Sequence, residues 1–164
     1  MEIIEYNQLD KTNYASQVAK LIDLYSDDFI PSLKVRSSML DRNFTRSIPI
    51  YPSTELYYRS IETHPAVLTI DNKKVLGFLS YIASTEEVYV STLIVDREYR
   101  KHGIAKYLYK YLIRTFPDLN ISARTWSTNK AHIHLLESIG FTLTKTLEND
   151  RTSGVDTVYY TLIR

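Results

Sequence analysis

The amino-acid sequence predicts an α+β fold. Three consecutive β-type runs within residues 66–95, separated by short polar turns, indicate an antiparallel meander. Apolar residues at helical spacing occur both before and after this meander. No segment repeats another, and 164 residues are enough to bury a core. We therefore predict one domain, residues 1–164.

The part of the chain before the meander is predicted to be mostly helical. Glu2–Tyr6 is a short β-type opening, and Asn13–Tyr25 places apolar residues on one helix face. Residues 27–65 are punctuated by prolines but are too hydrophobic for a disordered linker. Within them we expect two short helices, Leu33–Leu40 and Thr54–Thr63.

Strands and helices then alternate to the end of the chain. The meander consists of the strands Ala66–Ile70, Val75–Ala83 and Val88–Val95. Ile104–Thr115 carries an apolar stripe typical of an amphipathic helix, which Pro117 ends. We expect next a strand, a helix, a strand, a charged hairpin loop and a terminal strand: Leu119–Thr125, Lys130–Ile139, Phe141–Thr146, Glu148–Gly154 and Val155–Ile163.

Composition excludes several classes of protein. A formal net charge of +1 argues against a main role in binding nucleic acid or an anionic membrane. The chain has no cysteine, which excludes disulfides, thiolate zinc sites and a cysteine nucleophile. The first ten residues lack the apolar block of a secretory signal, and Val75–Thr85, the longest uncharged apolar stretch, is shorter than a membrane span. We expect a cytoplasmic protein.

The turn Arg100–Ala105 carries the clearest indication of function. It reads Arg-Lys-His-Gly-Ile-Ala and lies between a predicted strand and a predicted helix. Such a turn leaves unpaired amides at a helix N-terminus, where the helix dipole also favours an anion. Gly103 would allow a phosphate to approach the backbone closely, and Arg100 or Lys101 would add charge. The alternative is a plain turn glycine with a solvated basic rim.

Two segments resemble the GNAT superfamily of acyl-CoA-dependent N-acetyltransferases. Leu93–Ala105 resembles the acyl-CoA segment of the family, whose core is Arg/Gln-x-x-Gly-x-Gly/Ala. Asn129, followed by a predicted helix that ends in Gly140-Phe141, resembles the second segment. The resemblance runs from about Ala66 to the C-terminus. It implies a mixed, largely antiparallel sheet of about six to seven strands with helices on both faces.

The resemblance also implies an activity, the transfer of an acetyl group from acetyl-CoA to a primary amine by direct attack, without a metal. In the family, the main chain before the turn pairs with the pantetheine arm, and one amide, here that of Val95, polarises the thioester carbonyl. The implied partner is a small-molecule or peptide amine, and a homodimer stays open. The implied cofactor-binding residues are Leu93, Val95, Arg100, Lys101, His102, Gly103, Ile104, Ala105 and Asn129, although Asn129 is equally suited to cap a helix.

The acid and the base of this reaction are less well defined. A carboxylate or a water chain can take the proton of the amine. Glu87 is the predicted base, preferred over Glu86 because Glu86 lies in the turn; a solvated hairpin charge is the competing interpretation. Many relatives protonate the leaving thiolate with a tyrosine on the second segment's helix, but that position is Leu136 here. The general acid is therefore unassigned among 14 tyrosines.

Two further points concern the acceptor and the alternatives. The family usually selects its acceptor with the region between the first helix and the second strand, which is residues 27–65 here. The departure at Leu136 motivates a second function, a non-catalytic acyl-CoA-binding sensor or regulatory module. A site for ATP or GTP is disfavoured, because the chain has no Gly-x-x-x-x-Gly-Lys-Ser/Thr. Within residues 27–65, the candidate wall residues of the acceptor pocket are Tyr51, Tyr57, Tyr58 and Arg59. Helix packing explains Tyr57 and Tyr58 equally well.

Overall fold

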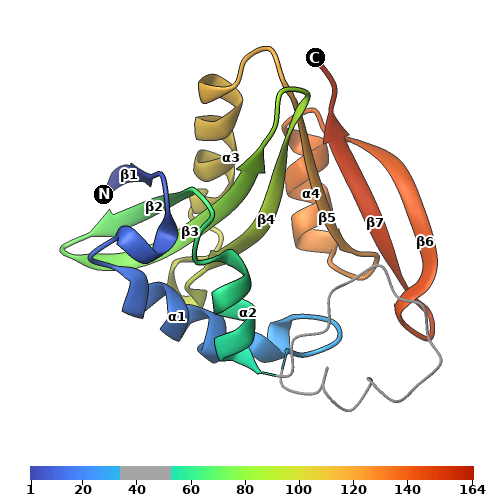
Figure 1. Cartoon of the computed structure of the whole chain (residues 1–164). Helices are drawn as coiled ribbons and strands as arrows, with labels where there is room; N and C mark the ends of the chain where they lie inside the picture. The colour runs from blue at the N-terminus through green and yellow to red at the C-terminus, as the bar shows by residue number, and fades with distance from the viewer. Residues whose placement is uncertain (34–52) are drawn as a thin grey trace.

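A single mixed sheet organises the protein (Figure 1). The computed structural model describes residues 1–33 and 53–164. Its strands are β1 (Glu2–Tyr6), β2 (Ala66–Asp71), β3 (Lys74–Ala83), β4 (Glu87–Val95), β5 (Asn120–Trp126), β6 (Thr142–Thr152) and β7 (Val155–Leu162). Within the described residues these seven strands lie in the order β1-β2-β3-β4-β5-β7-β6. Every neighbouring pair is antiparallel except β4–β5, which is parallel.

Helices cover both faces of this sheet. They are α1 (Ala15–Leu24), α2 (Thr54–Ile61), α3 (Ile104–Thr115) and α4 (Lys130–Ser138). On β3, Phe78 packs into the core cluster that contains α1 and α2, whereas its neighbour Leu79 packs into the cluster that contains α3 and α4. Consecutive strand side chains point to opposite faces, so the two helix pairs lie on opposite sides. The predicted mixed sheet with helices on both faces is confirmed.

The parallel strands β4 and β5 separate halfway along β4. Their pairing ends at Val90 and Ala123, yet β4 continues to Val95. The register between β3 and β4 is irregular just after Ser80, close to the same point. A bulge of this kind changes the direction of a strand and frees its edge from the neighbour. The functional site lies where the two strands have diverged.

Most predicted elements agree with the structure, but the last hairpin does not. Residues 148–154 were expected to form a charged loop, whereas β6 extends to Thr152 and the turn is short. Asp150 and Arg151 are only 8% and 5% exposed. The Thr157 hydroxyl donates to the Asp150 carboxylate, and Arg151 Nε donates to Thr157 Oγ1 at 2.9 Å. This buried polar contact explains why the charged segment continues the strand.

The N-terminal helices can be compared only in part. The predicted helix 54–63 corresponds to α2, and the predicted helix 13–25 corresponds to α1. The predicted helix at 33–40 lies outside the described residues from residue 34 onward. None of the helices in the described ranges is long and apolar enough to cross a membrane.

Candidate active site

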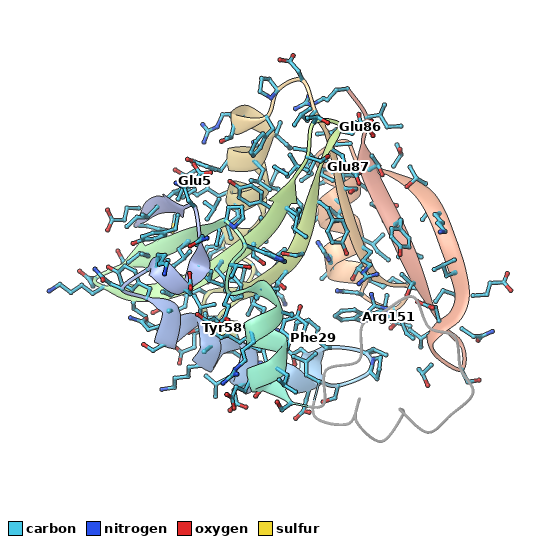
Figure 2. All side chains as sticks on the ribbon, in the orientation of Figure 1. Glu5, Phe29, Tyr58, Glu86, Glu87 and Arg151 are labelled. Atoms are coloured by element: carbon cyan, nitrogen blue, oxygen red, sulfur yellow. The ribbon has the colours of Figure 1, made fainter. Side chains whose placement is uncertain are left out.

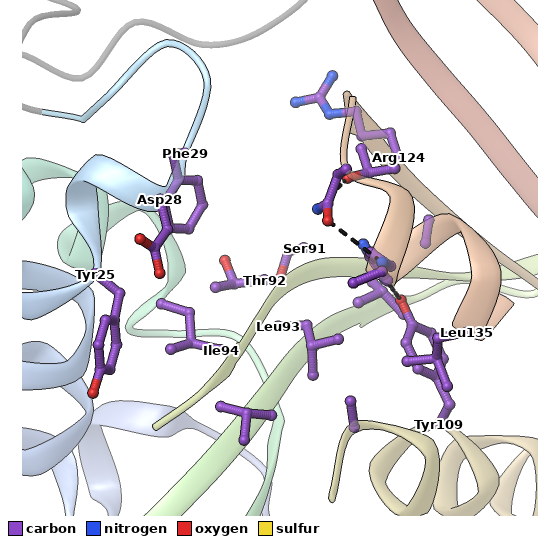
Figure 3. Close-up of a pocket in the computed structure, with 18 of the residues that line it drawn as sticks. Tyr25, Asp28, Phe29, Ser91, Thr92, Leu93, Ile94, Tyr109, Arg124 and Leu135 are labelled. Atoms are coloured by element: carbon purple, nitrogen blue, oxygen red, sulfur yellow. Dashed lines mark hydrogen bonds between the residues drawn. The ribbon is translucent and has the colours of Figure 1, made fainter. Parts of the chain in front are cut away.

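A cleft of about 1090 Å³ opens where β4 and β5 separate. Its lining includes residues 89–95 of β4, the first turns of α3 and α4, and the segment around Phe29. The close-up in Figure 3 shows β4 crossing the cleft, with residues from both sides of the sheet turned toward it. The labelled residues on one side of β4 are Tyr25, Asp28 and Phe29, and those on the other are Tyr109, Arg124 and Leu135.

The basic turn lies at one end of this cleft and leads into α3. Lys101 and Gly103 both have left-handed backbones, with φ of +65° and +80°. Gly103 is the N-cap of α3, and no side chain in the described part of the chain caps the helix there. The first-turn amides therefore lack a side-chain partner. A Cβ at Gly103 would meet no atom within 4 Å, so open space lies before these amides and fits a phosphate group.

The Arg100 side chain ties the turn to the end of β4 and to Asp28. Its Nε donates to the carbonyl of Val95 at 2.9 Å, and its Nη2 donates to Asp28 Oδ2 at 2.8 Å. The guanidinium also lies over the Tyr25 ring, 4.9 Å from the centroid. These contacts hold Arg100 within the fold, whereas Lys101 is exposed. Of the two cations predicted beside the phosphate, Arg100 and Lys101, the geometry therefore favours Lys101.

Two main-chain amides of β4 face the cleft. Asp96 N donates to Leu76 O, across from β4 on β3, at 2.8 Å. Backbone groups alternate sides along a strand, so the amides of Leu93 and Val95 point away from β3. The side chain of Arg100 reaches the Val95 carbonyl from that same side. The placement suits the predicted contact with a pantetheine arm, and the roles of Leu93 and Val95 stay predictions.

Asn129 begins α4 and caps it. Its Oδ1 accepts a hydrogen bond from His132 N at 3.4 Å, and its Nδ2 donates to Thr125 Oγ1 at 2.9 Å. Of the two roles expected for Asn129, the helix cap is therefore confirmed. Asn129 also lines the cleft, and its contact with the cofactor stays a prediction.

A hydrogen-bonded pair, the buried Tyr109 and the half-buried His132, joins α3 to α4 beside the cleft. Tyr109 is fully buried, and its hydroxyl lies 2.9 Å from His132 Nε2. Both residues line the cleft. Burial lowers the pKa of His132 to about 4 and raises the pKa of Tyr109 far above its usual value, so both side chains are neutral at pH 7. Leu136, at the position of the family's tyrosine, is fully buried in the core.

Tyr109 was not predicted as a site residue. It lies on α3 between Tyr107 and Tyr111, both of which are at least partly exposed, and next to the apolar stripe that was predicted for Ile104–Thr115. An aromatic residue next to such a stripe could have been included in the buried face.

Glu87, the predicted base, lies away from the cleft. Figure 2 shows Glu86 and Glu87 at the β3–β4 turn, far along the sheet from Phe29 and Arg151, which line the cleft. Glu87 is exposed, and its Oε2 accepts a hydrogen bond from Ser122 Oγ at 3.1 Å. Among the described residues, the lining of the cleft does not include Glu87. Its assignment as the base stays a prediction that this geometry does not support.

His64 is a second cleft residue that was not predicted from the sequence. Its ring lines the cleft, and its Nδ1 lies 3.1 Å from Ser91 Oγ, which in turn lies 2.8 Å from Ser80 Oγ. Burial lowers the pKa of His64. In the sequence His64 only precedes Pro65 at the end of a helix, so no motif could have identified it.

One wall of the cleft is aromatic. Phe29 packs against Tyr57 and Trp126, with ring centroids 5.6 and 6.1 Å apart. The Tyr57 hydroxyl lies 2.7 Å from Thr92 Oγ1 on β4. These rings join the segment before residue 33 to α2 and to the end of β5, and all three line the cleft. Figure 3 shows Phe29 on the side of the cleft opposite Tyr109 and Leu135.

Of the four predicted wall residues, one is placed at the cleft. Tyr57 lines it, whereas Tyr58 packs against the core cluster of α1 and α2. Arg59 forms an exposed ion pair with Glu55 at 2.7 Å. Tyr51 lies outside the described residues.

Comparisons with known proteins agree with this geometry. The chain matches the model of the acetyltransferase (GNAT) family over residues 19–141. No curated protein matches the chain by sequence at a significant level.

Solved structures share the fold at low sequence identity. An aminoglycoside 6′-N-acetyltransferase in complex with coenzyme A is 14% identical, with a TM-score of 0.69 over 99% of this chain and 96% of that one. The ribosomal-protein-S18-alanine N-acetyltransferase from Escherichia coli is 16% identical, with a TM-score of 0.67 over 98% and 93%. A protein from Bacillus anthracis assigned as a streptothricin acetyltransferase, in complex with acetyl coenzyme A, is 20% identical, with a TM-score of 0.55. The match spans 62% of this chain and 62% of that protein's length.

Proposed function

The chain belongs to the acetyltransferase (GNAT) family, and we propose that it transfers the acetyl group of acetyl-CoA to a primary amine by direct attack. The observation that carries the proposal is the start of α3, where a left-handed Gly103 opens the first-turn amides to the cleft. These amides lie on the same cleft as the outward-facing amides of Leu93 and Val95. Acetyl-CoA carries a diphosphate, which the first-turn amides of α3 could bind. It also carries an extended pantetheine arm, which the outward-facing amides of β4 could pair with.

The described residues divide the binding of acetyl-CoA between them. Acetyl-CoA, when bound, supplies the reactive thioester. The amides from Lys101 to Ala105, with the charge of Lys101, would bind the diphosphate. The main chain at Leu93 would pair with the pantetheine arm. The amide of Val95 would donate to the thioester carbonyl and stabilise the negative charge that develops on its oxygen.

Tyr109 is the proposed proton donor for the departing sulfur. It is neutral, lines the cleft and holds its hydroxyl 2.9 Å from His132 Nε2. A neutral imidazole carrying a proton on Nε2 could stabilise the phenolate that is left after the proton is given up. Because Leu136 offers no hydroxyl, Tyr109 would supply the function that many relatives assign to α4.

The acceptor is proposed as a small-molecule or peptide amine. The names of two similar structures give an aminoglycoside and a ribosomal-protein alanine as acceptors of those proteins. Both are primary amines on very different scaffolds, so the shared fold favours amine chemistry without selecting a scaffold. A cytoplasmic location and a homodimer stay predictions.

The absence of cysteine makes the test direct. A thiol reagent added to the protein, acetyl-CoA and a panel of primary amines would report only released CoA, because the chain has no thiol of its own. We expect amine-dependent release that Gly103→Trp abolishes, since the indole would fill the space before the first-turn amides. Tight acetyl-CoA binding without turnover on any amine would instead favour the non-catalytic binding module, to which the buried Leu136 points.

A further inference from the structure

Three side chains form a hydrogen-bonded line from the inside of the sheet to the cleft. Ser80 Oγ on β3 lies 2.8 Å from Ser91 Oγ on β4, and Ser91 Oγ lies 3.1 Å from His64 Nδ1. Ser91 is the residue at which the β3–β4 register is irregular. Next to it, Thr92 Oγ1 lies 2.7 Å from the hydroxyl of Tyr57 on α2. The side chains of Ser91 and Thr92 therefore both point toward α2 and the segment that follows it.

The burial of Ser80 and the tautomer of His64 set the direction of these hydrogen bonds. Each serine hydroxyl carries one proton. Ser80 is fully buried, and Ser91 is its hydrogen-bond partner among the described side chains, so the proton of Ser80 points to Ser91. In the tautomer of His64 that carries its proton on Nε2, the proton of Ser91 points to the unprotonated Nδ1, which can accept it.

We propose that Ser91 and His64 form the proton relay that deprotonates the acceptor amine. The inference rests on the proposed acetyl transfer. The nitrogen lone pair of the amine forms the bond to the acetyl carbon, and the carbon–sulfur bond breaks with its electron pair on sulfur. The proton of the nitrogen passes to Ser91 Oγ while the proton of Ser91 passes to His64 Nδ1. Sulfur takes a proton from Tyr109, the imidazolium of His64 returns its proton to solvent, and the phenolate of Tyr109 regains a proton from solvent once the products leave the cleft.

The position of the relay suits this step. Ser91 lies two residues before Leu93 on β4, a Cα separation of about 6–7 Å in an extended strand. Its side chain is hydrogen-bonded to His64, in the junction between α2 and β2, whereas Tyr109 lies on α3 on the other side of the sheet. An amine would thus lose its proton on the α1–α2 side, while sulfur would gain one on the α3–α4 side. The proton acceptor and the proton donor do not compete for one position.

Burial supports a neutral imidazole at His64, because it lowers the pKa of the ring. The titratable groups on the neighbouring elements are Asp10 in the 3-10 turn η1 (Leu9–Lys11), whose backbone pairs with residues 62–64, Glu62 after α2, and Tyr57 and Tyr89 at the cleft. The carboxylates of Asp10 and Glu62 would act in the opposite direction, toward the imidazolium. A neutral imidazole is a competent proton acceptor at pH 7. It is a weaker base than a free amine, so the amine must arrive neutral and lose its proton as the new bond forms.

The first arm of the test uses turnover. His64→Ala and Ser91→Ala should each lower kcat by about 10²–10⁴-fold, and calorimetry should show unchanged affinity for acetyl-CoA. Thr63→Ala, at the exposed neighbouring position, should keep the wild-type rate. Free imidazole should restore part of the rate of His64→Ala. At saturating amine, where protonation of the free amine does not contribute, the wild-type kcat should fall on the acid side with a pKa below ~6.5, and this limb should vanish in His64→Ala.

The second arm does not require turnover. An NMR titration of the His64 ring should give a pKa below the ordinary ~6.5, and Ser91→Ala should raise it by removing the donor to Nδ1. The relay is overturned if His64 titrates at or above the ordinary value. It is also overturned if an active protein keeps its rate and acid limb in His64→Ala but loses them in Glu87→Gln. A wild-type protein that acetylates no amine would refute the proposed function, while the titration still tests the hydrogen bond itself.

Discussion

Replacing His132 by Asn should flatten the acid side of the protein's stability curve. In the folded chain, burial lowers the pKa of His132 to about 4, whereas an unfolded histidine titrates near ~6.5. Between these values the unfolded state binds a proton that the folded state excludes. The free energy of unfolding therefore falls as the pH falls through this window.

The size of the effect follows from the two pKa values. Proton linkage predicts that His132 lowers the free energy of unfolding by about 2 kcal/mol between about pH 7.5 and pH 5, and by about 1 kcal/mol more by pH 4. At neutral pH the substitution has a different cost, since it leaves the buried hydroxyl of Tyr109 without its partner. That cost is independent of pH, so the two effects separate in a pH series.

Urea unfolding followed by circular dichroism at several pH values between 7.5 and 5 would measure this difference. The wild-type chain should lose about 2 kcal/mol more than His132→Asn over that range. His134→Ala removes an exposed histidine from the same helix and should keep the wild-type pH dependence. Equal losses for the wild type and His132→Asn would refute the neutral imidazole of His132 on which the Tyr109 proposal depends.

Three further substitutions test other parts of the account. Gly103→Ala should cost about 1 kcal/mol in chemical denaturation, because alanine tolerates a φ of +80° poorly although it meets no neighbour; an unchanged midpoint would contradict this. Tyr109→Phe should lower kcat by about 10²-fold or more without raising KM for acetyl-CoA. Tyr107→Phe, at an exposed position of α3, should keep the wild-type rate. Equal rates for the two variants would exclude Tyr109 as the proton donor. Tyr25→Phe should cost about 1–3 kcal/mol in urea unfolding, because it removes the buried donor 2.8 Å from Asp96 Oδ1, and a stability equal to the wild type's would show that this contact contributes nothing.

The parts of the fold that sequence could predict are those set by local patterns. The meander and α3 follow from short-range periodicity, and the turn at Gly103 follows from a glycine between a strand and a helix. Asn129 was assigned two roles because capping residues and ligand-binding residues can be of the same type. Only its side-chain contacts showed that it caps α4.

The remaining site residues could not be predicted, because they meet only through folding. His64 and Ser91 are 27 positions apart, and Tyr109 and His132 are 23 apart. Neither pair belongs to a motif, and each depends on how a helix end docks against β4 or on how two helices cross. For Glu87 the strand β4 was predicted correctly, but its position was not enough to place the residue at the site. Glu87 lies at the end of β4 that is away from the cleft.

The most direct test of the central claim is to map where acetyl-CoA binds. Addition of acetyl-CoA to the isotope-labelled protein should shift most strongly the backbone amide signals of residues 93 and 95 and of residues 101–105. Gly103→Trp, which fills the space before α3, should abolish these shifts while the spectrum remains that of a folded chain. Binding of acetyl-CoA that leaves the amides of this turn unperturbed would contradict the account.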